Sequence, residues 1–150
     1  MKKALLLSIN IGLLLSYLFT YYCHGEIKAY TNELTQELLT KYENIKKERM
    51  NHLGIGILVA IIISYIYYSN TPNQISNFEK LNIIILLLLL LPMIVYKLLP
   101  KSDYMLKHSQ SDQDYKDWFN IYLCMKNKAV CGFMYGFTVS MIILRIMNVN

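Results

Sequence analysis

Four stretches of almost uninterrupted apolar residues alternate with polar segments along the chain. The most apolar, residues 81–99, contains no acidic residue and no cation before Lys97. As a helix with ~1.5 Å rise per residue it would be roughly 28 Å long, close to the ~30 Å hydrocarbon thickness of a bilayer. In lipid only a helix satisfies its own backbone polar groups. The pattern therefore predicts a membrane-spanning helix, kinked by Pro92 rather than ended by it.

Three further segments have the same character: residues 4–22, 53–68 and 129–147. Residues 4–22 are longer than the apolar region of a signal peptide and no small-residue cleavage site precedes Cys23, which favours an uncleaved anchor over a cleaved signal. An interfacial or re-entrant segment is a third alternative. The tyrosines that end 53–68 suit the interfacial aromatic belt, and Arg145 is close enough to the end of the last segment to reach the interface.

The polar segments between the spans contain two predicted amphipathic helices, residues 26–50 and 112–125. In the first, apolar residues recur at steps of three and four: Ile27, Tyr30, Leu34, Leu38, Tyr42 and Ile45. This pattern favours a helix on the membrane surface, and a short coiled coil with a partner is the alternative. After four spans, 150 residues leave no room for a separate soluble core. The predicted fold is an all-α polytopic integral membrane protein, a single membrane domain over 1–150.

The second amphipathic helix and the last span carry the most specific residues. Ser111 and Asp114 have the spacing of a capping box at a helix start. The helix then presents an aromatic stripe, which predicts anchoring at headgroup depth or, alternatively, docking of a partner protein: Tyr115, Trp118, Phe119 and Tyr122. Gly132 and Gly136 form a G-x-x-x-G motif, which predicts close helix contact within the chain or between copies.

The distribution of charge bears on orientation and partners. Eleven of the fifteen cations lie in residues 23–52 and 97–128, so the positive-inside rule predicts that both segments are cytosolic. Lys2 and Lys3, ahead of the first span, argue against this orientation, because a basic N-terminus normally stays in the cytosol. A cluster next to the second span has the charge to attract anionic headgroups: Lys46, Lys47 and Arg49. Acidic residues are mixed with the cations in both segments, so the net charge of +5 does not predict nucleic-acid binding.

The sequence contains no recognisable catalytic, cofactor or metal-binding motif. Its three cysteines form no C-x-x-C, and on one helix Cys124 and Cys131 would be ~10.5 Å apart in rise, beyond disulfide reach. The neighbours Cys23 and His24 lack a supporting carboxylate, and His52 lacks a second ligand at metal spacing. The predicted spans carry no acidic residue of the kind that marks proton-coupled transporters. We therefore expect a protein that is not an enzyme and takes no cofactor.

The last third of the chain resembles a viral family. The order of residues Ser102–Leu106, Gln113, Trp118, Tyr122, Met125, Gly132 and Gly136 is similar to small integral membrane proteins encoded by nucleocytoplasmic large DNA viruses. The resemblance implies a structural component of a virion membrane beneath a capsid, without enzymatic activity. The chain departs from it at Lys107 and His108, where a more apolar sequence is expected.

These features predict a structural or scaffolding multi-pass membrane protein, and the resemblance implies a location in a virion membrane or host endomembrane. Its expected partners are the bilayer, other membrane or capsid proteins, and further copies of itself. The alternative is a small channel, a transporter subunit or an accessory subunit of a membrane enzyme. Few polar residues at or inside the spans are available to line a pore, which favours the structural prediction: Ser64, Asn82, Thr138 and Ser140.

Overall fold

The computed structural model describes residues 2–72, 75–108 and 111–146, and every regular element within them is helical. The elements are α1 (Lys2–Tyr21), α2 (His24–Glu33), α3 (Gln36–Asn70), α4 (Asn77–Leu98), the short 3₁₀ helix η1 (Met105–Lys107) and α5 (Asp112–Ile146). Four helical stretches are long and apolar enough to cross a membrane: Lys3–Glu33, Gln36–Asn70, Asn77–Leu98 and Asp112–Ile146. The all-helical prediction is confirmed, as is the presence of four such helices.

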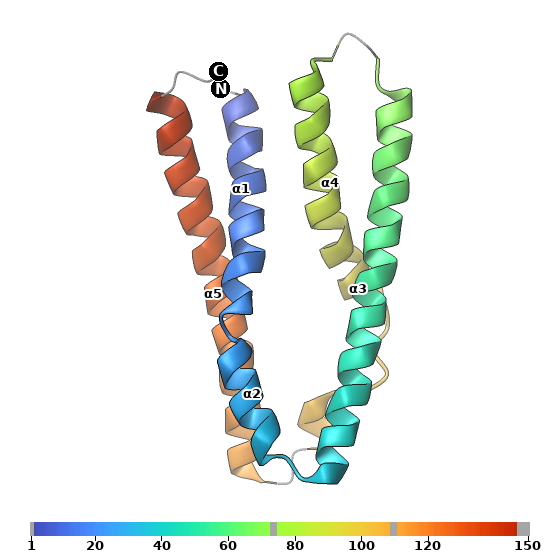
Figure 1. Ribbon diagram of the computed structural model, residues 1–150, viewed down its shortest axis with the longest axis vertical. Coiled ribbons are helices and arrows are strands. Elements are labelled where there is room, and N and C mark those ends of the chain that lie inside the picture. The colour runs from blue at the N-terminus through green and yellow to red at the C-terminus, as the bar shows by residue number, and fades with distance from the viewer. Residues whose placement is uncertain (1, 73–74, 109–110, 147–150) are drawn as a thin grey trace.

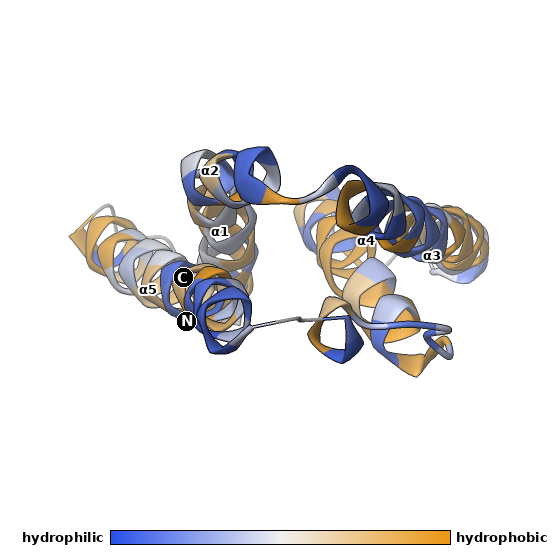
Figure 2. Ribbon diagram, turned by 90° about the horizontal axis from the view of Figure 1, so that it is seen from below, coloured by the Kyte–Doolittle hydropathy of each residue, from blue (hydrophilic) through white to orange (hydrophobic). Residues whose placement is uncertain are grey.

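The long helices form two antiparallel pairs. Helix α1 packs along α5, α3 packs along α4, and α1 also touches α4 (Figure 1). The start of α1, the end of α5, the end of α3 and the start of α4 lie at one end of the molecule (Figure 1). The other end, here called the head, consists of residues 22–50, 99–108 and 111–128. Figure 2 looks at the molecule from this side and shows hydrophilic residues concentrated on α2 and on the near part of α3.

The structure corrects the predicted boundaries of the amphipathic helices. Residues 26–50 are not one helix, because α2 ends at Glu33 and α3 begins at Gln36. Between them the backbone at Thr35 is extended, and its hydroxyl accepts a hydrogen bond from the Leu38 N–H and so caps α3. Helix α3 then runs unbroken into the predicted second span, since no Pro or capping sequence separates the two.

Helix α5 likewise joins the predicted helix 112–125 to the predicted span 129–147, whose last residue lies outside the described part of the chain. Its start is the predicted capping box. The Ser111 hydroxyl accepts from the Asp114 N–H and the Asp114 carboxylate accepts from the Ser111 N–H, each at 3.1 Å. Helix α4 continues past Pro92 to Leu98, so the proline does not end it.

Glycines bring the paired helices into backbone contact. A Cβ atom on Gly132 would lie 2.6 Å from the Leu15 carbonyl oxygen, and one on Gly136 would lie 3.0 Å from the Gly12 Cα. Both glycines therefore face α1 of the same chain. In the second pair, a Cβ on Gly56 would lie 2.8 Å from the Cα of Pro92. Only glycine permits such approaches, because any side chain would displace the neighbouring backbone.

A buried polar contact between α1 and α4 joins the two pairs. The Asn10 amide on α1 donates to the backbone carbonyl of Asn82 on α4 at 2.9 Å and to its side-chain oxygen at 3.2 Å. The Asn82 amide in turn donates to the Phe78 carbonyl. Asn10 did not figure in the sequence prediction, because a single Asn in an apolar helix does not show which neighbour it faces. The contact fixes how α1 is rotated against α4.

Candidate functional site

The head contains an aromatic core contributed by α2, α3, η1 and α5. Tyr30, Met105 and Ile121 are buried at its centre. The Trp118 ring packs beside them, with its centroid 5.6 Å from that of Tyr30 and 6.3 Å from that of Tyr42. Further partly buried residues surround the centre: Ile27, Leu34, Ile45 and Met125. The apolar face predicted to lie on a membrane surface is instead covered by α5 and η1.

The predicted aromatic stripe is divided between two sides of α5. Trp118 faces the head core, whereas Tyr115, Phe119 and Tyr122 are 43% to 53% exposed. The rings of Tyr115 and Phe119 stack on each other with centroids 6.3 Å apart. The outward residues therefore form an aromatic surface that the other described residues leave about half exposed, and Trp118 is not part of it.

A disulfide between Cys23 and Cys124 links the start of α2 to α5, and Cys131 is free and exposed. Cys23 is completely buried, and the two Cα atoms are 6.4 Å apart. The sequence prediction considered only Cys124 with Cys131 and missed this pair. The signal was present, because Cys23 follows Gly12 by eleven residues and Cys124 precedes Gly136 by twelve. Antiparallel helices that touch at the glycines bring the two cysteines to the same level.

The disulfide also determines whether Cys23, Cys124 and Glu26 can bind a metal ion. The two sulfur atoms and a carboxylate oxygen of Glu26 lie within 4.8 Å of one another, a spacing compatible with a metal ion. Thiolates, however, are the metal-binding form of cysteine. Because these sulfurs are bonded to each other, metal binding would first require reduction of Cys23 and Cys124.

Helix α3 holds the segment that follows α4 through charged side chains. The Glu48 carboxylate accepts from the Ser102 N–H at 2.8 Å, and this hydrogen bond lowers the Glu48 pKa. His108 hydrogen-bonds the Asp103 carboxylate, which lowers the Asp103 pKa. Arg49 donates to the Asp103 carbonyl and lies 5.2 Å from the Tyr104 ring centre.

The predicted headgroup cluster is consequently split. Arg49 is turned into the head, where it contacts Asp103 and Tyr104, while Lys46 and Lys47 are exposed. Only the two lysines are placed to meet lipid headgroups from the surface of α3.

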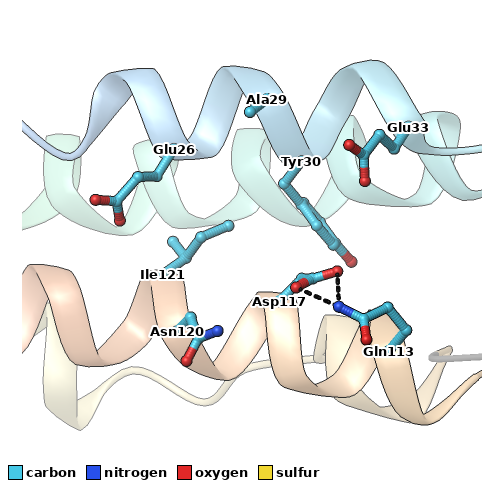
Figure 3. Close-up of a pocket in the computed structure, with 8 residues that line it drawn as sticks. All are labelled: Glu26, Ala29, Tyr30, Glu33, Gln113, Asp117, Asn120 and Ile121. Atoms are coloured by element: carbon cyan, nitrogen blue, oxygen red, sulfur yellow. Dashed lines mark hydrogen bonds between the residues drawn. The ribbon is translucent and has the colours of Figure 1, made fainter.

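An open groove of about 390 Å³ runs between α2 and α5 in the head (Figure 3). Its lining includes the carboxylates of Glu26 and Glu33 from α2 and of Asp117 from α5. The Gln113 amide donates to both oxygens of Asp117 at 2.9 and 3.1 Å and holds that carboxylate in place. Tyr30 lies between the two helices. Its pKa is raised by burial and, to a smaller extent, by the nearby Asp114 and Asp117 carboxylates.

No family model, curated protein or solved structure matches the chain. The spans, the exposed aromatic surface and the group of Cys23, Glu26 and Cys124 are therefore the features on which a functional proposal rests.

Proposed function

We propose that the chain is a multi-pass membrane protein that crosses the bilayer four times and serves a structural or scaffolding role. The observation that carries this proposal is the exposure of its apolar helices. Only 11% to 22% of the most apolar window of each candidate span is buried by the rest of the chain. Leu58, Ile62 and Ile66 on α3 are each more than half exposed. Apolar surface of this extent is unfavourable in water and suits hydrocarbon.

The scaffolding role is supported by the head, which contains a disulfide and an exposed aromatic surface. The Cys23–Cys124 disulfide and the packed core hold α2 and α5 together. The exposed rings of Tyr115, Phe119 and Tyr122 offer the large, stiff apolar contacts that dominate protein interfaces. We propose that this surface docks other membrane proteins or further copies of the chain, with a capsid protein as the partner that the viral resemblance implies.

Replacing Tyr115, Phe119 and Tyr122 together by Ser tests the docking role. We expect the variant to insert normally but to lose the proteins that co-purify with the tagged wild type after crosslinking in its native membrane. The control replaces Tyr65 and Tyr68, exposed aromatics at the far end of α3, by Ser and should retain those partners. Equal retention by both variants would contradict the docking role.

Two features of the chain bear on which side of the membrane the head faces, namely its cations and its disulfide. The cation count predicts the cytosol, whereas disulfides persist in oxidising compartments. Several head cations already serve internal contacts: Lys101 donates to the Tyr96 and Leu99 carbonyls, and Lys128 donates to the Tyr22 carbonyl. We give the disulfide greater weight, because it is a specific bond at a buried position. The head is therefore proposed to face an oxidising compartment.

Blocking free thiols in intact cells before lysis tests this orientation. We expect Cys23 and Cys124 to resist alkylation until a reductant is added. A membrane-impermeant maleimide should label a cysteine introduced at the exposed Lys47 position only from the oxidising side, in a Cys131→Ser background. Labelling from the cytosolic side, with both native thiols reduced, would restore the orientation predicted from the cations.

The alternative function is a small channel or transporter subunit, and Asn10 and Asn82 are its best support because they are polar, buried and inside candidate spans. Their amides are joined to each other, which favours a packing role over a conducting one. Single-channel recording in planar bilayers separates the proposals. A conductance altered by Asn10→Leu would favour the channel.

A further inference from the structure

The Cys23–Cys124 disulfide has a carboxylate beside it. An oxygen of Glu26 and the two sulfur atoms lie within 4.8 Å of one another. Thiolates and carboxylates are ligands that Zn²⁺ takes in proteins, in a tetrahedral arrangement. Among the residues that the structure describes, this is the one group with the number and spacing of ligand atoms that a metal ion requires.

The start of α2 places Cys23 and Glu26 next to each other. Cys23 is the N-cap residue of this helix and Glu26 lies in its first turn, three residues later, so the two side chains are neighbours on one face. An N-cap side chain usually accepts a hydrogen bond from the helix. The Cys23 side chain makes no such bond, and Glu26 takes part in none of the ion pairs among the described residues. Their ligand atoms are therefore not held by other protein groups, apart from the disulfide itself.

The third ligand comes from the pairing of α1 and α2 with α5. Cys23 and Cys124 are 101 residues apart in the sequence, which is why no metal motif was recognisable there. Cys23 is completely buried, Cys124 is partly buried and Glu26 is exposed. Solvent therefore reaches the group from the Glu26 side. Zinc sites with three protein ligands keep a water molecule in the fourth position, and the exposed side has access to one.

Reduction converts the disulfide into two metal ligands. Two molecules of a thiol such as glutathione supply two electrons and two protons, so the S–S bond breaks, each cysteine becomes a thiol and the glutathione is oxidised to its own disulfide. Zn²⁺ then replaces the two thiol protons, which pass to water. With Zn–S bonds of ~2.3 Å, tetrahedral zinc holds two sulfurs about 3.8 Å apart. The Cα atoms of Cys23 and Cys124 are 6.4 Å apart, so rotation of the two side chains reaches that spacing without moving the helices apart.

We propose that Cys23, Cys124 and Glu26 form a redox-controlled zinc site. The disulfide links the start of α2 to α5 when the two cysteines are oxidised, and Zn²⁺ links them when the cysteines are reduced. The head thus keeps a bond between these helices in both states. This inference goes beyond the scaffolding role and does not depend on the docking surface.

The test measures zinc binding by the full chain in phosphatidylcholine nanodiscs. A Cys131→Ser background leaves only the two candidate thiols. The chain is reduced with a phosphine, which is removed under nitrogen before metal is added. We expect one Zn²⁺ per reduced chain, by elemental analysis and by competition with a chromogenic chelator, and none in the oxidised chain. Co²⁺ in place of zinc should give a thiolate-to-cobalt charge-transfer band and the visible bands of tetrahedral coordination.

Substitution of the carboxylate separates a ligand from a nearby charge. Glu26→Gln should weaken zinc binding by about tenfold or more, a loss that even a residue outside the coordination sphere causes. The matched control, Glu33→Gln, removes the same charge from the other end of α2 and should bind zinc as the background chain does. Cys23→Ser with Cys124→Ser should abolish binding.

Trp118 emission reports whether the head is folded in each variant and redox state, and zinc should reverse any change that reduction causes. Three results would overturn the proposal: no zinc bound by the reduced chain, equal binding by the variant that lacks both cysteines, or an equal loss in Glu26→Gln and Glu33→Gln. None of them affects the docking test on Tyr115, Phe119 and Tyr122, so the two proposals fail separately.

Discussion

Helices α3 and α5 run from the candidate spans into the head, yet the two regions are held together by different kinds of contact. Within the spans, α1 and α5 meet backbone to backbone at Gly12, Gly132 and Gly136. Within the head, the continuation of the same pair is joined by a disulfide and by Trp118 packed on Tyr30. In the bilayer proposed for these helices, lipid would provide no hydrophobic drive for association, so close packing would have to hold the helices together. Water does provide that drive, and large aromatic residues use it.

Introducing bulk at the glycine contact should have the largest effect. Gly132→Ile with Gly136→Ile forces α1 away from α5, because even a Cβ at Gly132 would lie 2.6 Å from a backbone oxygen. We expect a loss of about 3 kcal/mol or more, the sum of two overpacked positions. Thermal unfolding in detergent measures it.

Gly54→Ile is the matched control for this prediction, since nothing lies within 4 Å of a Cβ built there. It should leave the unfolding temperature close to that of the wild type. If the double variant at Gly132 and Gly136 unfolds at the same temperature as this control, close backbone approach does not hold the spans together.

Truncating the aromatic core should destabilise the head by a smaller amount. Trp118→Ala removes a partly buried ring that packs on Tyr30 and Tyr42, with an expected loss of about 2 kcal/mol. In the wild type, Trp118 emission should be that of a shielded indole and resist iodide. Phe119→Ala, on the exposed face, should cost less than ~0.5 kcal/mol. A fully hydrated Trp118 would contradict the packed head.

The hydrogen bonds from Asn10 to Asn82 should contribute less to stability than the aromatic core does. Asn10→Leu breaks the hydrogen bonds to Asn82, and interhelical hydrogen bonds in membranes are typically worth about 1 kcal/mol. A double-mutant cycle with Asn82→Leu measures the coupling. Strictly additive effects of the two substitutions would mean that the side-chain pair itself adds no stability, because the Asn82 backbone carbonyl remains as an acceptor for Asn10 in Asn82→Leu.

Acid should produce the smallest effect, confined to the segment between α4 and η1. Hydrogen bonds lower the pKa of Glu48 and of Asp103 in the folded protein. A lowered folded-state pKa adds stability that is present above the unfolded value and is lost as the pH falls through the folded one. The protection of the Ser102 amide against exchange, measured relative to its intrinsic rate at each pH, should therefore fall below the ordinary Glu value of 4.5. Glu48→Gln should remove most of that pH dependence.

Much of the helical part could be predicted from sequence because local causes determine it. The length and hydrophobicity of residues 81–99 by themselves indicate a long apolar helix, and the capping box of Ser111 and Asp114 marks the start of α5. The break at Thr35 was missed, because the apolar period of α2 continues across it into α3. The spacing of apolar residues does not by itself reveal a break between two helices when both helices turn their apolar faces to the same side.

The sequence by itself determined that this protein has four apolar helices long enough to cross a membrane, since length and hydrophobicity are properties of single segments. Only the tertiary structure decided which helices pair, and that pairing produced everything proposed for the head. It joined Cys23 to Cys124, turned Trp118 inward and set Glu26 beside the two sulfur atoms. The reason is physical. Contacts between residues a hundred positions apart depend on the register of whole helices, and that register is set by a few glycine contacts distributed along the chain.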